Sequence, residues 1–490
     1  MTTLLATVPE TCACDPVASG TVVAGTVASD PAAPRTVVSD PVASQPVPAL
    51  LPVVGADTRV PVVDGTSAVY ANLDCAASAP ALQSVAERVA EVLPLYASVH
   101  RGAGYLSQVS TALYESARST VAAFVGARQD DVAIITRNTT DSLNLLAGVV
   151  PGPVLVLDVE HHANLLPWVH AARARHRTTI LPVAPTVAAT LDALRAELVA
   201  NPYVLVAVTG ASNVTGEALP LEQVVSAAHE AGARVVVDGA QLVPHRGFSL
   251  TGTGADYVAL SGHKTYAPFG AGALVGRRDW LDQGTPYLAG GGAVRDVRAD
   301  RTLWQPAPAR HEAGSPNVLG AVALAQACQT LAALPAGALV AHEEALRSRL
   351  VGGLEALDGV RVLRVWPDSV DPVGVVSFTV ADLDPGLVAA VLSAEHGIGV
   401  RDGRFCAHPL LAHLSASEGA VRASVGVGTT SEAVDRLVTA LGLLLEEGPR
   451  AQYAVVDGCW TVVDDPRPLL DVPGLDHLAA TAAAACGPAV

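Results

Sequence analysis

Lysine is almost absent from this chain of 490 residues. Lysine and arginine together number 30, and only one of them, Lys264, is a lysine. Arginine keeps its charge in proteins, whereas lysine can lose its proton and become a nucleophile. Because every other basic residue is arginine, we expect Lys264 to be needed as an amine. The alternative is a surface lysine that survived by chance.

Charged and aromatic side chains are also scarce, at 16% and 4% of the residues, whereas hydrophobic residues make up 50%. The length allows two or more domains, with a core built mainly from small aliphatic residues. The chain has no continuous apolar run of about 18 residues, which argues against a membrane span. Residues 1–10 lack a basic region, so we expect no secretory signal. The net charge of -17 argues against a nucleic-acid partner.

The cysteines are few, and no Cys-x-x-Cys pair occurs among them. An odd count without this spacing argues against a disulfide framework and against a structural zinc site. We therefore expect a reducing cytoplasm as the compartment. The seven cysteines are Cys12, Cys14, Cys75, Cys328, Cys406, Cys459 and Cys486.

The composition changes along the chain and predicts four parts. Residues 1–57 are rich in Pro, Val, Ala, Ser and Thr and predict a disordered, low-complexity extension. Residues 58–330 alternate short apolar strands with helical patterns, which predicts an α/β domain with a mostly parallel sheet. Residues 331–448 predict a smaller α+β domain. Residues 449–490 predict a loose tail, in which Trp460 is the candidate for contact with the body.

Polar residues cluster directly after the predicted strands at 132–136, 154–157, 204–208, 234–237 and 256–260. Ligands of a parallel sheet bind beyond the carboxyl ends of its strands, so these residues predict one site. They are Asn138, Thr139, Thr140, Glu160, His161, His162, Ser212, Asn213, Asp238, Gln241, Ser261, His263 and Lys264.

A lysine in such a place predicts a covalent anchor, as a Schiff base, for pyridoxal 5'-phosphate (PLP). Asp238 follows an apolar strand and is a candidate to hold the pyridinium nitrogen protonated, or else it caps a turn. Gln241 is a candidate for the ring hydroxyl. His161 is a candidate both to stack on the ring and to move a proton.

A phosphate and a substrate carboxylate require further groups. Thr139 and Thr140 open a predicted helix, whose free N–H groups favour a phosphate, and Ser261 and His263 can complete that cradle. Arg422 lies in a predicted strand and is a candidate clamp for the substrate carboxylate. The alternative for Arg422 is an interdomain salt bridge.

Taken together, ordered blocks of this sequence resemble the class V aminotransferase superfamily of fold-type I PLP enzymes. Within it they are most similar to SUF-type (group II) cysteine desulfurases and selenocysteine lyases. The resemblance runs from about Ala71 to Leu444 and implies a fold-type I homodimer acting on an L-amino acid, cysteine or a related one. The blocks are residues 71–78, 99–102, 136–140, 160–164, 212–216, 237–241, 261–264, 312–317 and 400–407.

The resemblance also implies roles for single residues. Lys264 would carry the cofactor, and Ser315 would reach the phosphate of the neighbouring subunit. Asn213 and Arg422 would bind the substrate carboxylate, and Arg401 is assigned to the same substrate site. Cys406 would attack the substrate sulfur, which leaves a persulfide on Cys406 and releases alanine, and a protein that accepts the sulfur would be a partner.

Two departures from the family pattern bear on Cys406. Arg404 and Phe405 stand where the family usually has two histidines, and Gly104 stands where it usually has another. Cys406 as a buried small apolar residue is therefore the alternative to the nucleophile. A C–S lyase, an aminotransferase or an epimerase without sulfur transfer is a second possibility. A PLP-binding regulatory or scaffold protein without turnover is a third.

Overall fold

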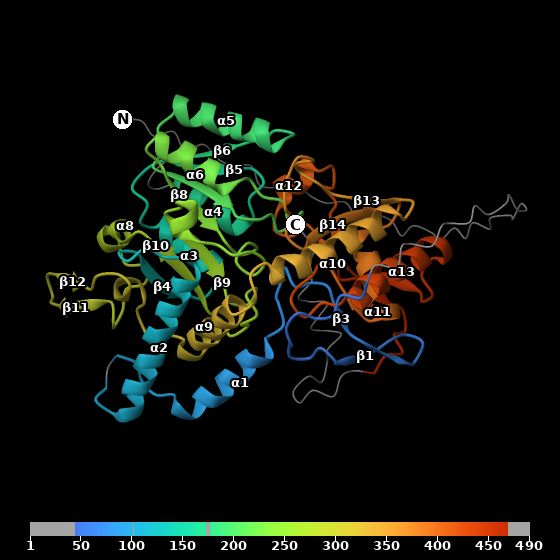
Figure 1. Cartoon of the computed structure of the whole chain (residues 1–490), viewed down its shortest axis with the longest axis horizontal. Helices are drawn as coiled ribbons and strands as arrows, with labels where there is room; N and C mark the ends of the chain where they lie inside the picture. Colours follow the sequence, from blue (N-terminus) through green and yellow to red (C-terminus); the bar gives the residue numbers. More distant parts are fainter. Residues whose placement is uncertain (1–44, 101, 173–176, 469–490) are drawn as a thin grey trace, which may run out of the picture. The chain divides into compact units, whose positions relative to one another are not determined.

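The computed structural model describes residues 45–100, 102–172 and 177–468. Its largest element is a seven-stranded sheet with the strand order β4-β10-β9-β8-β7-β5-β6 (Figure 1). Neighbouring strands from β9 to β6 run parallel, which confirms the predicted α/β fold with a mostly parallel sheet. The strands are β4 (Val132–Thr136), β5 (Val154–Leu157), β6 (Thr178–Leu181), β7 (Leu205–Thr209), β8 (Arg234–Asp238), β9 (Tyr257–Ser261) and β10 (Gly272–Gly276).

Strand β10 was not predicted, and it is antiparallel to both of its neighbours, β4 and β9. Glycines at both of its ends make the segment look like a loop in the sequence. A Cβ atom on Gly272 would lie 2.5 Å from the carbonyl oxygen of Leu260 and 2.7 Å from the Cα of Asn138. Glycine is therefore required where the ends of β4 and β9 approach each other.

Helices cover both faces of this sheet because alternate strand residues point to opposite sides. Val235 and Val237 of β8 belong to a core shared with α2, α6 and α9, whereas Val236 belongs to a second core with α3 and α4. The helices of this part are α1 (Gln83–Val92), α2 (Tyr105–Phe124), α3 (Thr139–Ala147), α4 (His162–Ala172), α5 (Val187–Ala200), α6 (Leu221–Glu230), α7 (Leu250–Thr253), α8 (Arg278–Gln283) and α9 (Val318–Ala332). Shorter elements are η1 (Leu93–Leu95), β11 (Val294–Val297), β12 (Thr302–Trp304) and η2 (Ala309–His311).

A second, antiparallel sheet has the order β13-β14-β17-β16 and a core of its own with α10, α11 and α13. Its strands are β13 (Val360–Val362), β14 (Val375–Val380), β16 (Arg401–Gly403) and β17 (Ala420–Ser424). Its helices are α10 (Ala338–Glu355), α11 (Pro385–His396), α12 (His408–His413) and α13 (Ser431–Glu447). The early strand β3 (Ala71–Asn72) pairs in parallel with β15 (Ile398–Gly399), and β1 (Arg59–Pro61) pairs with β2 (Ser67–Val69). The domain boundaries near residues 330 and 448 stay predictions.

Contacts with the rest of the fold begin earlier than the predicted boundary at residue 57. The N–H groups of Leu50 and Leu51 both donate to the carbonyl of Val427, at 2.7 and 3.0 Å. Val47 N–H donates to the hydroxyl of Ser431 at 3.0 Å. The sequence did not predict these contacts with a distant loop, because the proline-rich composition of the segment is typical of a disordered chain. The rest of the predicted extension, residues 1–44, lies outside the described residues.

The predicted tail contains a hairpin of β18 (Tyr453–Val456) and β19 (Cys459–Val462). Trp460, which the sequence singled out, donates its indole N–H to Asp384 at 2.9 Å. Residues 469–490 of the predicted tail lie outside the described residues. Within the described ranges, no helix has the length and apolarity to cross a membrane.

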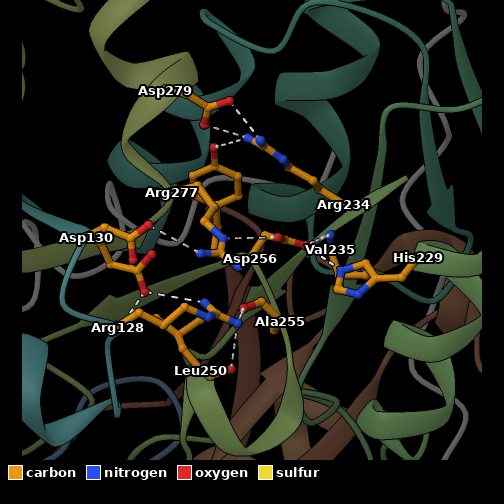
Figure 2. A network of polar contacts seen from close by, with 12 residues as sticks. Arg128, Asp130, His229, Arg234, Val235, Leu250, Ala255, Asp256, Arg277 and Asp279 are labelled. Atoms are coloured by element: carbon orange, nitrogen blue, oxygen red, sulfur yellow. Dashed lines mark hydrogen bonds and ion pairs between the residues drawn. The ribbon is translucent and has the colours of Figure 1, made fainter. Parts of the chain in front are cut away.

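Ion pairs tie together the amino-terminal edge of the large sheet (Figure 2). The buried Asp256 accepts the N–H of Val235 at 2.9 Å, and its carboxylate lies 2.8 Å from Nε2 of His229. Arg234 forms a two-point pair with Asp279, with both distances at 2.7 Å. These contacts stabilise the amino-terminal ends of β8 and β9. The predicted site residues lie at the opposite edge, at the carboxyl ends of the strands.

Candidate active site

Thr139 and Ser261 meet at the carboxyl edge, although 122 residues separate them in the sequence. The hydroxyl of Ser261 lies 2.8 Å from the hydroxyl of Thr139 and accepts the Thr139 N–H at 2.8 Å. Asn138 caps α3 by accepting the N–H of Asp141 at 3.0 Å. The start of α3 thus combines the positive end of the helix dipole with the buried hydroxyls of Thr139 and Ser261, an arrangement that suits a phosphate. Thr140 is exposed on the next position of this helix.

Lys264 lies in the turn that follows β9, with its N–H donating to the carbonyl of Ser261 at 3.3 Å. Burial lowers the pKa of Lys264 to about 8, while the Asp238 carboxylate acts in the opposite direction and Arg422 adds to the decrease. A lysine with this pKa is partly neutral near physiological pH, so it can act as a nucleophile and as a base. Burial also lowers the pKa of the neighbouring His263.

Asp238 and His161 each accept a hydrogen bond from the backbone N–H two residues further along the chain. Asp238 is 4% exposed and accepts the N–H of Ala240 at 3.0 Å. Burial raises the pKa of Asp238, and the Ala240 N–H and Lys264 partly offset this. Burial lowers the pKa of His161 to about 3, and its Nδ1 accepts the N–H of Ala163 at 3.0 Å. The ring is therefore neutral with its proton on Nε2, which is free to donate.

Gln241 presents one unused acceptor to the same region. Its Nε2 donates to the carbonyl of Ala76 at 2.7 Å. Its Oε1 is buried and has no hydrogen-bond partner among the described residues. A buried acceptor without a partner is costly, so this oxygen is expected to meet a donor on a ligand.

Glu160 is a residue to which sequence reasoning gave no role, although it directly precedes His161. It is fully buried, accepts the N–H of Thr209 at 2.9 Å and accepts the amide of Asn164 at 2.7 Å. Burial raises the pKa of Glu160 to about 8. By joining the ends of β5 and β7, it fixes the loop that carries His161. The i, i+4 spacing of Glu160 and Asn164 in one sequence block was the available signal.

Arg422 forms a salt bridge, whereas its role as a clamp for the substrate carboxylate stays a prediction. It is 3% exposed on β17, donates to the carbonyl of Asn213 at 2.9 Å and forms an ion pair with Asp74 at 3.0 Å. Its Nε is buried without a partner among the residues that the structure describes. Burial lowers the pKa of Arg422, and Asp74 opposes this effect. Arg401 lies opposite Arg422 in the register of β16 and β17 and is exposed.

Cys406 occupies a turn held by two backbone carbonyls. The amide of Asn213 donates to the carbonyl of Phe405 at 2.8 Å, and the N–H of His162 donates to the carbonyl of Cys406 at 2.8 Å. The thiol is exposed, so the alternative of a buried small apolar residue is wrong. It lies near enough to Lys264 and Arg422 for its charge to act on both.

Histidines stand beside this turn, although Arg404 and Phe405 replace the two expected before Cys406. The rings of His162 and His408 lie edge to face, with their centroids 4.6 Å apart.

Elsewhere, Gly104 directly precedes α2 as its N-cap. Ser315 is exposed on the segment after Glu312, so its predicted reach to a second subunit stays a prediction.

The family model for class-V aminotransferases matches residues 71–437. The chain belongs to the class V aminotransferase family and is a PLP-dependent enzyme. It is 36% identical over 389 residues to a probable cysteine desulfurase of Vibrio cholerae, covering 78% of this chain and 94% of that protein. It is 39% identical over 354 residues to probable cysteine desulfurase 2 of Mycobacterium leprae, covering 70% and 83% of the two chains.

Solved structures show the same likeness. The cysteine desulfurase CsdA of Escherichia coli superimposes with a TM-score of 0.68 at 34% identity, covering 77% of this chain and 95% of that one. The apo cysteine desulfurase of Thermococcus onnurineus NA1 gives a TM-score of 0.70 at 33% identity with the same coverage. These likenesses confirm the predicted fold-type I architecture.

The residues at the carboxyl edge fit PLP. The unpartnered oxygen of Gln241 suits the ring hydroxyl, and the hydroxyls of Thr139 and Ser261 suit a phosphate at the start of α3. The buried carboxylate of Asp238 suits a ring nitrogen, and Lys264 supplies the amine.

Proposed function

We propose that this chain is a cysteine desulfurase, which moves the sulfur of L-cysteine onto Cys406 and releases L-alanine. The observation that carries the proposal is the exposed Cys406 thiol on a turn fastened to Asn213 and His162, within electrostatic reach of Lys264 and Arg422. The names of the two bacterial relatives and of the two superimposed structures support it.

Different residues of the chain are assigned to different parts of the cofactor. Lys264 would hold the cofactor aldehyde, Asp238 the ring nitrogen and Gln241 the ring hydroxyl, and His161 would lie against the ring. When bound, PLP supplies a sink for the electrons released at the substrate Cα. The phosphate is held by Thr139, Thr140, Ser261 and His263, together with Ser315 of the partner subunit.

The substrate is held by its carboxylate and attacked at its sulfur. Arg422 and Asn213 bind the carboxylate, with Arg401 at the rim of the site. Lys264, as a neutral amine, removes the Cα proton. The Cys406 thiolate then attacks the thiol sulfur: an S–S bond forms, the Cβ–S bond breaks, and Cβ retains the electron pair and takes up a proton. Lys264 then returns a proton to Cα, which gives alanine.

Three further assignments belong to this proposal. The enzyme acts as a homodimer, because Ser315 is assigned to the phosphate of the neighbouring subunit. The persulfide passes to a sulfur-acceptor protein, which the exposure of Cys406 allows. The compartment is a reducing cytoplasm, since Cys406 must remain a thiol between turnovers.

The test compares wild-type holoenzyme with Cys406→Ala, using Cys459→Ala as a matched control for loss of a cysteine. With a dithiol reductant present to release the persulfide sulfur as sulfide, we expect Cys406→Ala to keep the visible absorbance of bound PLP and to lose sulfide release from L-cysteine by about 100-fold or more. Cys459→Ala should stay within about twofold of wild type. Alanine must form in an amount equal to the sulfur released.

Other products would contradict the proposal in specific ways. Undiminished sulfide release from Cys406→Ala, accompanied by pyruvate, would indicate a C–S lyase. A keto acid would indicate an aminotransferase, and a racemised amino acid an epimerase. Bound PLP whose spectrum no amino acid changes would indicate a regulatory or scaffold protein without turnover.

A further inference from the structure

Phe405 connects the two residues assigned to the substrate carboxylate. Its ring lies against the guanidinium of Arg422, with the Cζ atom 5.1 Å from the ring centroid. Its carbonyl accepts the side-chain amide of Asn213 at 2.8 Å. Arg422 in turn donates to the backbone carbonyl of Asn213 at 2.9 Å, so the three residues close a ring of contacts.

These contacts leave the guanidinium of Arg422 little freedom. One terminal nitrogen is used by Asn213, the other is paired with Asp74, and the Phe405 ring lies against the group. The Nε position is the one buried without a partner in the described part of the chain. A guanidinium fixed on three sides has a defined free edge for a carboxylate.

The same residue constrains the nucleophile. Phe405 and Cys406 are both in the left-handed region, with φ angles of 50° and 52°. This region is unfavourable for residues other than glycine, so the turn needs contacts with the rest of the protein to persist. Phe405 is buried, and its carbonyl is one of the two that hold the turn.

We propose that Phe405 is a positioning residue that aligns Arg422 for the substrate α-carboxylate and links this clamp to the turn of Cys406. The inference rests on the proposed function for its substrate. Phe405 stands where the family usually has a histidine, and its side chain here supplies an aromatic face rather than a proton. Selectivity for substrates with an α-carboxylate therefore depends on this ring.

The experiment compares Phe405→Leu and Phe405→Tyr holoenzymes with wild type on L-cysteine and on cysteamine, which has the thiol and the amine but no carboxylate. Leucine keeps the apolar volume and the backbone carbonyl but loses the aromatic face, whereas tyrosine keeps the face. We expect Phe405→Leu to raise KM for L-cysteine about fivefold to tenfold with little change in kcat. For cysteamine, kcat/KM should stay within about twofold, and Phe405→Tyr should behave as wild type with both substrates.

A binding measurement makes the inference independent of turnover. L-alanine titrated into each holoenzyme, followed by absorbance, should show a Kd about fivefold to tenfold higher for Phe405→Leu and unchanged for Phe405→Tyr. If wild type makes no alanine from L-cysteine, the proposed function fails, and this titration still decides the role of Phe405.

Three results would overturn the inference. One is an equal loss with L-cysteine and cysteamine in Phe405→Leu, which would mean that the ring only supports the fold. Another is a Phe405→Tyr enzyme as impaired as Phe405→Leu. The third is an unchanged Kd for L-alanine in Phe405→Leu.

Discussion

Glu312 and Arg118 form a buried two-point ion pair, with distances of 2.5 and 2.8 Å, that joins α2 to the segment carrying Ser315. Glu312 also accepts the N–H of Ile135 at 2.7 Å, so the same carboxylate holds β4, the strand that leads into the start of α3. Glu312 thus supports both of the segments whose residues, Thr139 and Ser315, we assign to phosphate binding.

Removal of Glu312 should therefore destabilise the fold. Glu312→Ala leaves Arg118 buried with the partly exposed Glu115 as its remaining carboxylate, and we expect a loss of about 2–3 kcal/mol in the free energy of unfolding. Denaturant unfolding of the apoprotein measures this. The exposed pair Arg88–Glu91 is the control, since Glu91→Ala should change stability by less than about 0.5 kcal/mol. Equal effects of the two variants would contradict the structural role of Glu312.

Lys264 should be the covalent attachment point of PLP. Borohydride treatment of the wild-type holoenzyme should add the mass of reduced PLP to the peptide that contains Lys264. Lys264→Ala should bind PLP without covalent trapping and lose its turnover of L-cysteine. Because Lys264 is the chain's only lysine, trapping on the variant would have to involve the α-amino group, and its detection on any internal peptide would refute the assignment.

The rate at which apoprotein takes up PLP should depend on pH through the Lys264 amine. Burial lowers the pKa of Lys264 to about 8, and only the neutral amine attacks an aldehyde. The rate should therefore rise as pH increases through about 8 and level off about one unit above it. Stopped-flow absorbance from about pH 6.5 to about pH 9.5 measures this. A rate that still rises steeply at the upper end of this range, toward the ordinary lysine pKa of 10.5, would contradict it.

Trp460 should fasten the C-terminal hairpin to α11. Its N–H donates to Asp384, which also caps α11 by accepting the N–H of Gly386 at 2.8 Å. Trp460→Ala should lower stability by about 1–2 kcal/mol and speed hydrogen exchange in the first turn of α11. Val455→Ala, at an exposed position of the same hairpin, is the control and should change neither measurement.

Much of the large domain was predictable because its strands are short apolar segments that end in polar residues. The strands at 132–136 and 154–157 lie where the apolar runs placed them, and the helix that starts at Thr139 begins at the predicted residue. Strand β10 was missed because Gly272 and Gly276 weaken its pattern. Glycine is needed there by the approach of Asn138, which is a contact between distant parts of the chain.

The residue types of the candidate site were visible in the sequence, whereas their connections were not. The placement of the blocks after strand ends brought Thr139, Ser261, Asp238 and Lys264 to one edge. The bond between Asn213 and the carbonyl of Phe405 depends on two segments 192 residues apart. Every residue has a backbone carbonyl, so this hydrogen bond does not restrict the residue type at position 405. No sequence pattern could therefore reveal the bond.

By itself, the sequence determined the family, the cofactor chemistry and the single amine, Lys264, because these depend on residue type and on local order along the chain. The tertiary structure alone decided that Cys406 is exposed, that Arg422 is both ion-paired and left with a free Nε, and that Phe405 joins them. These properties depend on burial and on contacts between the two sheets, and both arise only when distant segments pack together.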